Sequence, residues 1–120
     1  MAYFNPLTTQ DAAISNGASL SAAVELTEGQ LVALLMPAAW TAAAVSFDVS
    51  YDGSTYAPLY NANGEVKVAS THISTSERRV LALDPVDFLG AKYVKVRSGL
   101  NGAAVNQGGA RTVTLLIRGV

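Results

Sequence analysis

The sequence predicts an all-β domain, an antiparallel β-sandwich of jelly-roll type with about eight strands. Apolar and polar residues alternate with a period of two in several short segments, which is typical of half-buried strands. Turn-forming Gly, Pro, Asn and Asp separate these segments at near-regular intervals. No apolar pattern of helical period runs longer than a turn or two, so the strands must pack on one another.

The N-terminal segment, residues 1–19, is mixed in character and weakly patterned. We expect an extended arm that packs along the domain or onto a neighbouring chain, with Tyr3, Phe4 and Leu7 as its anchors. A flexible terminus is the alternative. The sandwich itself is expected to span residues 20–120.

The first regular strands are expected at 20–26 and 31–36. The second segment, LVALLM, is apolar on both faces, as in a central strand that is covered on both sides. A buried helix is the competing interpretation, but the short length between Gly29 and Pro37 favours a strand. A crossover at 37–43 follows, and its Trp40 is interpreted as a core or rim anchor in preference to a ligand platform.

The clearest strand pair lies at residues 44–60. The side chains expected on its buried face are Val45, Phe47, Val49 and Tyr51. Asp52-Gly53 then indicates a tight turn, because glycine readily adopts positive φ. A second strand begins at Thr55, and Pro58 marks it as an edge or a bulge.

Further strands are expected at 65–70, 79–83, 92–98 and 110–118. Asp84 should cap a short helical turn before the third of these segments. In segment 92–98 the pattern places Tyr93, Lys95 and Arg97 away from the core. The side chains predicted with most weight to be buried are Phe47, Val49, Val94, Val96, Leu115 and Ile117.

Composition narrows the functional classes. Charged residues make up 14% of the chain, against about 25% in ordinary soluble domains, which suggests a surface that packs against other chains. The net charge of −1 and the absence of a basic block predict no nucleic-acid partner and no membrane partner. We see no signal peptide, and the run at 31–36 is too short to span a bilayer, so we expect a soluble protein made in the cytoplasm.

The residues offer little catalytic chemistry. There is no cysteine, and the single histidine, His72, lies in a polar segment where an exposed loop residue is expected in preference to a general base. Asp48, Asp52 and Glu65 carry oxygen ligands of the kind that calcium prefers, but their spacing matches no calcium loop. We therefore expect no catalytic residues, no cofactor and no metal.

Carbohydrate binding is the main small-molecule alternative. Four tyrosines could act as stacking platforms on strand faces or loops: Tyr51, Tyr56, Tyr60 and Tyr93. Their spacing also fits ordinary sandwich packing, which is the interpretation that the pattern favours.

Two segments resemble discoidin-type, galactose-binding-like jelly rolls. They are FDVSYDGSTYAPLYNANGE at 47–65 and AKYVKVR at 91–97. In those domains a Val-Ser-x-Asp-Gly hairpin precedes a strand in which basic residues alternate with Val or Ile. The resemblance implies the fold and carries no ligand residues with it.

A second resemblance covers about residues 20–118. The order LVALLMPAAWTAAAVSF, SYDGSTY, LDPVDFLGAKYVKVRSG and ARTVTLLI is similar to small virion accessory proteins of tailed bacteriophages. It implies a structural virion protein, most simply a capsid decoration or cement protein on the head exterior, bound to the major capsid protein and to copies of itself. A carbohydrate-binding module on a phage tail or fibre is the alternative, with a glycan as its partner.

The weakly patterned N-terminus and the glycine-rich loop 99–109 are the segments expected to contact other chains. Ordering either of them in an isolated chain costs roughly 1–2 kcal/mol per residue, which burial against a partner would offset. The candidate contact residues are Tyr3, Phe4, Leu7, Leu100, Asn101, Val105, Asn106 and Gln107.

Overall fold

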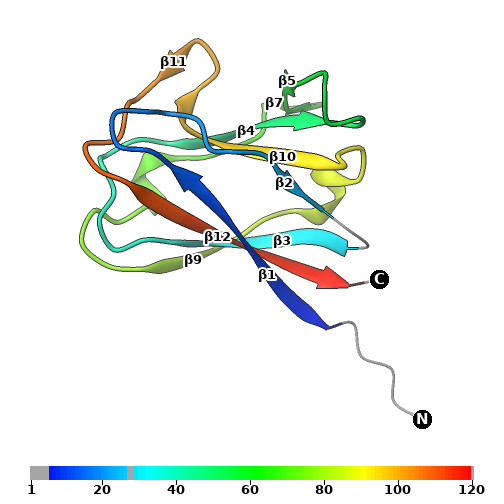
Figure 1. Cartoon of the computed structure of the whole chain (residues 1–120), viewed down its shortest axis with the longest axis horizontal. Coiled ribbons are helices and arrows are strands. Elements are labelled where there is room, and N and C mark those ends of the chain that lie inside the picture. The colour runs from blue at the N-terminus through cyan, green and yellow to red at the C-terminus, as the bar shows by residue number, and fades with distance from the viewer. Residues whose placement is uncertain (1–5, 27–28, 120) are drawn as a thin grey trace.

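A computed structural model of the chain describes residues 6–26 and 29–119, which form two facing antiparallel sheets (Figure 1). The strands are β1 (Leu7–Ile14), β2 (Val24–Glu25), β3 (Gly29–Met36), β4 (Val45–Ser50), β5 (Ala57–Pro58), β6 (Tyr60–Asn61), β7 (Gly64–Glu65), β8 (Lys67–Val68), β9 (Arg79–Ala82), β10 (Tyr93–Leu100), β11 (Ala103–Ala104) and β12 (Arg111–Gly119). Two 3₁₀ helices, η1 (Ser70–His72) and η2 (Pro85–Phe88), interrupt them. No helix in the described part of the chain has the length and apolar character needed to cross a membrane.

The strand order is that of a jelly roll. One sheet has the order β1-β12-β3-β9, and in the other β10 and β4 form the centre, with β2 and β11 on β10 and with β5 and β8 on β4. The chain crosses between these two sheets repeatedly, as along β1, β2, β3 and β4, so that β12 lies between β1 and β3, both of which are distant from it in sequence. This arrangement confirms the predicted fold class.

The core lies between the two sheets and is almost wholly aliphatic. Phe47 meets Phe88 of η2 edge to face, with ring centroids 5.0 Å apart, and Trp40 is buried with its Nε1–H donating to the carbonyl of Ala43 at 3.2 Å. Trp40 is thus a core anchor, as expected. Of the six side chains predicted to be buried, Val49 is half-buried and the others are buried, namely Phe47, Val94, Val96, Leu115 and Ile117.

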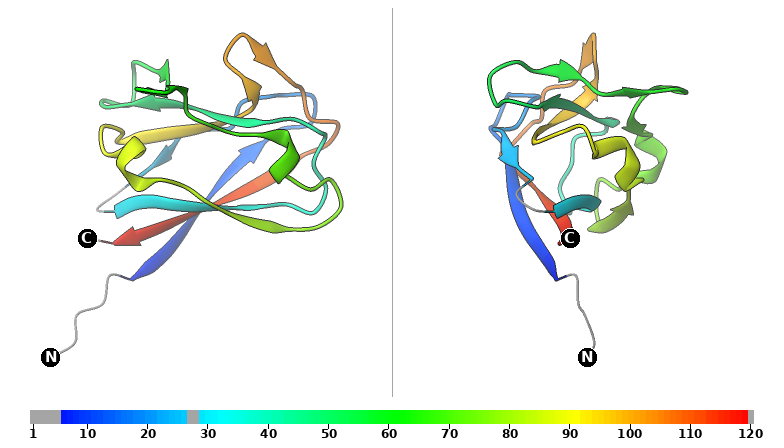
Figure 2. Two further views of the ribbon diagram at one scale, coloured as in Figure 1. Left: turned by 180° about the vertical axis from the view of Figure 1, so that it is seen from behind. Right: turned by 90° about the vertical axis from the view of Figure 1, so that its right-hand side faces the viewer.

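Part of the expected N-terminal arm is a strand of the domain's own sheet. Every residue of β1 is in register with β12, and the start of β1 lies beside the end of β12 (Figure 2). Ala12 and Ile14 enter the core, whereas the preceding residues 6–11 are exposed. The sequence pattern does not predict this strand, because apolar residues occupy its inner side only at the end, at Ala12 and Ile14.

The strand pair at 44–60 also differs from the expectation. β4 ends at Ser50, so the alternation does not extend to Tyr51, which is 73% exposed where a buried ring was expected. The hydroxyl of Ser50 accepts the N–H groups of Asp52 and Gly53, which turns the chain away from the sheet. Asp84, in contrast, caps η2 as predicted, since its Oδ1 accepts the N–H of Val86 at 3.1 Å.

Candidate functional site

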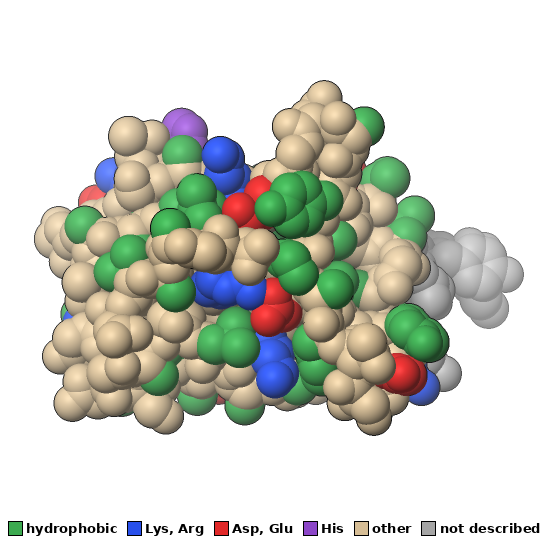
Figure 3. All heavy atoms as spheres, turned by 90° about the horizontal axis from the view of Figure 1, so that it is seen from above, with side chains coloured by type: hydrophobic (Ala, Val, Ile, Leu, Met, Phe, Trp, Pro, Cys, Tyr) green, Lys and Arg blue, Asp and Glu red, His purple; other side chains and the backbone are tan. Residues whose placement is uncertain are grey.

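The outer side of β4 and β10 carries most of the polar side chains in the centre of the second sheet, and we call it the polar face. Val94, Val96 and Phe47 point into the core, so their neighbours in sequence point outward. The register sets outward residues of the two strands side by side: Tyr93 opposite Ser50, Lys95 opposite Asp48, and Arg97 opposite Ser46. In Figure 3 basic and acidic side chains lie next to one another in the middle of this side, with hydrophobic side chains around them.

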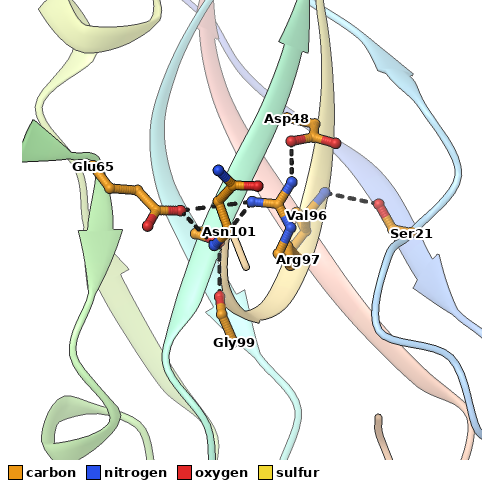
Figure 4. A network of polar contacts seen from close by, with 8 residues as sticks. Ser21, Asp48, Glu65, Val96, Arg97, Gly99 and Asn101 are labelled. Carbon is orange, nitrogen blue, oxygen red and sulfur yellow. Dashed lines mark hydrogen bonds and ion pairs between the residues drawn. The ribbon is translucent and has the colours of Figure 1, made fainter. Parts of the chain in front are cut away.

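Arg97 is the centre of an ion-pair network on this face (Figure 4). Its guanidinium donates to the hydroxyl of Ser46 at 3.1 Å and to the carboxylate of Asp48, and it lies 3.6 Å from Glu65 of β7. Glu65 also accepts the N–H of Asn101 at 2.9 Å. Arg97 lies on the outer side of β10, away from the core, yet it is only 8% exposed where Asp48 and Glu65 pair with its guanidinium.

The network is internally satisfied. Every buried side-chain nitrogen or oxygen in the described residues has a hydrogen-bond partner. Asp48 and Glu65, which could have ligated calcium, are both paired to Arg97, and the described part of the chain contains no cluster of three or more His, Cys, Asp or Glu placed to hold a metal ion. The network therefore fixes the strands and loops of the polar face relative to one another.

Two half-buried tyrosines lie at the other end of the polar face. The ammonium of Lys95 lies 4.3 Å from the centroid of the Tyr56 ring, a cation–π contact. Tyr93 packs against Gly53, where a Cβ atom would come within 2.9 Å of its Cε1. The loop after β4 thus lies directly on the ring of Tyr93.

Two further tyrosines project from fixed loops beside this face. Tyr51 is 73% exposed and Tyr60 is 56% exposed. Asp52 holds the loop of Tyr51, because its Oδ1 accepts the N–H groups of Thr55 and Ser54 and the hydroxyl of Ser50, each at 2.9 Å. These hydrogen bonds hold the pKa of Asp52 below its usual value.

Tyr60 is held by the short β6–β7 hairpin, in which it faces Glu65. The side-chain amide of Asn61 next to it donates to Asp87 of η2 at 3.2 Å. Both exposed rings therefore stand on loops whose backbone is tied by hydrogen bonds. Of the four tyrosines singled out from the sequence, Tyr51 and Tyr60 are the ones whose rings solvent reaches most freely.

The residues predicted to contact other chains are dispersed. Leu7 is 48% exposed, Asn101 and Asn106 are exposed, and Leu100 and Val105 are half-buried. Tyr3 and Phe4 lie outside the described residues. Contact of these residues with another chain remains a prediction.

Gln107 differs from that expectation, because its side chain lies inside the domain and is 1% exposed. Its amide oxygen accepts the N–H of Thr41 at 2.8 Å, and its amide nitrogen donates to the carbonyl of Thr41 at 3.0 Å and to the hydroxyl of Ser98 at 2.7 Å. Gln107 thus ties the loop 99–109 to the crossover before β4. A glycine-rich sequence around it gave no sign of this buried role.

His72 is exposed in η1, and its carbonyl accepts a hydrogen bond from Arg79 at 3.3 Å. A separate open hollow of about 290 Å³ lies outside the first sheet. Its lining combines the end of β3 and the crossover with two threonines of β12, and Arg78 is its charged residue. Neither place assembles a nucleophile with a base.

The chain is thus a β-sandwich whose second sheet carries the polar face with the exposed Tyr51 and Tyr60 beside it. No protein-family model matches the chain, and no curated protein matches it. Among solved structures the chain is similar to a pectin binding carbohydrate binding module, with 16% sequence identity over 96% of this chain and 91% of that chain and a TM-score of 0.39.

Proposed function

We propose that the protein is a non-catalytic carbohydrate-binding protein that holds a glycan against the polar face and its exposed tyrosines. One observation carries the proposal: two large aromatic side chains, Tyr51 and Tyr60, stand well exposed on loops that hydrogen bonds hold in place. A rigid ring binds with a small loss of conformational entropy.

The chemistry of the face suits a sugar. The flat side of a tyrosine ring packs against the apolar C–H side of a pyranose, while hydroxyl groups around the pyranose ring need hydrogen-bond partners. Lys95 supplies an ammonium group on the polar face, with the Tyr56 ring beneath it. The Arg97 network keeps the underlying strands from shifting when the ligand arrives.

Affinity electrophoresis of the purified chain through gels that contain neutral or acidic polysaccharides tests the proposal. Burial of one tyrosine ring contributes roughly 1–2 kcal/mol, so Tyr51→Ala and Tyr60→Ala should each weaken binding about 5- to 30-fold. The matched control is Val80→Ala, since Val80 is 62% exposed but lies on β9 in the other sheet. Equal migration of all variants, or no retardation by any polysaccharide, would rule out the proposed face.

A structural role in a virion is the second candidate. It is supported by the sequence resemblance to phage accessory proteins and by the low charge content of the chain, 14%. The capsid protein as partner and the head exterior as location are part of that candidate, and the comparisons offer no support for either. The candidate gains if the chain binds no glycan and instead forms assemblies of copies of itself.

A further inference from the structure

The free edge of β1 is the feature of the fold that glycan binding leaves unexplained. β1 lies at one side of the first sheet, and among the described residues it pairs with β12 alone. Residues 6–11 are all exposed. The eight residues of β1 run in unbroken register with β12, so no bulge turns this edge away from solvent.

The pairing pattern identifies the unpaired main-chain groups. The N–H of Gly119 donates to the carbonyl of Pro6 at 2.8 Å, and bonded pairs recur at every second residue of an antiparallel ladder. The even-numbered residues of β1 therefore face β12, and Leu7, Thr9, Asp11 and Ala13 direct their N–H and C=O groups outward. The carbonyl of Ala13 accepts the N–H of Ala22 at 3.3 Å, which leaves Leu7, Thr9 and Asp11 facing solvent.

Edge strands usually carry a device that prevents pairing with another chain: short length, lysine, proline or a bulge. The opposite edge of the same sheet has such devices, because β9 is four residues long and begins at Arg79, directly after Arg78. In the other sheet β5 is two residues long and contains Pro58. β1 has none of them, and Asp11 is its single charged residue.

We propose that β1 is a homodimer interface, in which β1 of a second copy of this chain pairs antiparallel with it about a two-fold axis at Thr9. The choice of a second copy follows from self-complementarity, since a two-fold axis brings the same strand edge onto itself. With the axis at Thr9, Thr9 faces its own equivalent and Leu7 faces Asp11. This register pairs every free N–H of the three residues with a free C=O of the partner.

The same register also keeps like charges apart. Asp11 of one copy faces Leu7 of the other, and its carboxylate already accepts the hydroxyl of Thr114 at 3.1 Å. The dimer would extend the first sheet from four strands to a continuous eight. The polar faces lie on the other sheet, so dimerisation leaves both of them open, and the inference stands apart from the proposed function.

Sedimentation equilibrium of the full chain over a wide concentration range should show a monomer–dimer equilibrium. Thr9→Lys places two like charges opposite each other at the axis and should raise the dimer dissociation constant at least about tenfold. Thr9→Glu should do the same. The control Thr112→Lys adds the same charge to β12 of the same sheet, away from the edge, and should leave the dissociation constant unchanged.

Mixing the Thr9→Lys and Thr9→Glu proteins tests the axis itself. Opposite charges then meet at the two-fold position, so native mass spectrometry should show the mixed dimer in excess over both single-variant dimers. At concentrations low enough that all three proteins are monomeric, thermal melts of the two variants should match the wild type, because the Thr9 side chain is exposed and its N–H is not bonded to β12. A wild-type chain that stays monomeric would overturn the proposal, even if that monomer binds an unrelated extended peptide. A mixture without enrichment of the mixed dimer would overturn it as well.

Discussion

Replacing Arg97 with methionine is the single substitution that should disturb the polar face most. The substitution keeps a long side chain of similar length and removes only the guanidinium. It leaves the carboxylates of Asp48 and Glu65 without their shared cation, with side chains that are 17% and 11% exposed. The hydroxyl of Ser46 loses its donor in the same step.

The magnitude follows from burial. Breaking a buried ion pair by removing one partner costs about 3–5 kcal/mol, because the remaining charge stays desolvated. For a chain of 120 residues, a loss of 1 kcal/mol in the free energy of unfolding lowers the melting temperature by about 4 °C. Arg97→Met should therefore lower the melting temperature by roughly 12–20 °C. Arg97→Lys keeps the charge without the planar fork and should cost roughly 1–2 kcal/mol.

Urea unfolding followed by tryptophan fluorescence measures the effect, since Trp40 is buried and is the single tryptophan. The chain contains its own control in the pair of Arg79 and Glu77, whose atoms are 2.9 Å apart but whose side chains are 42% and 63% exposed. Arg79→Met should cost less than about 1 kcal/mol, as exposed pairs do.

A triple variant separates the loss of the pair from the loss of packing. With Asp48→Asn and Glu65→Gln added to Arg97→Met, no buried charge remains, and at least about 1 kcal/mol of stability should return. If Arg97→Met is no worse than Arg79→Met, or if the triple variant is less stable than the single one, the network does not hold the face as we describe.

Three further changes have defined outcomes. Gly99→Ala should destabilise the fold by about 3–5 kcal/mol, since φ is +92° and a Cβ would meet the carbonyl of Ala103 at 2.5 Å, whereas Gly102→Ala, with φ +83° and open space, should cost about 1–2 kcal/mol in the same urea assay. Gln107→Leu should cost about 3 kcal/mol, because it leaves the partly buried N–H and C=O of Thr41 without their amide partner, and a loss below about 1 kcal/mol would mean that water replaces the amide. The lowered pKa of Asp52 means that its ionised form stabilises the turn above about pH 4 and that this contribution is lost as the pH falls through the lowered pKa; a carboxyl NMR titration of Asp52 at or above its ordinary value would contradict this.

The alternating segments were predictable because their pattern and their environment agree. In 92–98 and 110–118 one side of each strand meets the core, so the period of two specifies both the strand and its inner face. The turns at Asp52-Gly53 and Asp84-Pro85 carry their own chemistry and were predictable for that reason.

The misses share a different cause, which is the effect of distant segments. Alternation placed Arg97 correctly on the outer face, but only the fold shows that Glu65, far from it in sequence, covers it. Gln107 is buried because the crossover around Thr41 meets the loop there. β1 becomes a strand because β12 offers it an edge, a partner that lies a hundred residues away and that no local pattern records.

Chemical-shift mapping with a retained oligosaccharide tests the central claim most directly. In ¹⁵N- and aromatic-¹³C-labelled protein, titration should shift the ring signals of Tyr51 and Tyr60 and the amides of 50–56 and 60–65, while the hollow beside Arg78 and Thr112 stays unchanged. Shifts confined to that hollow, or spread over the first sheet with both tyrosine rings unmoved, would contradict binding at the polar face.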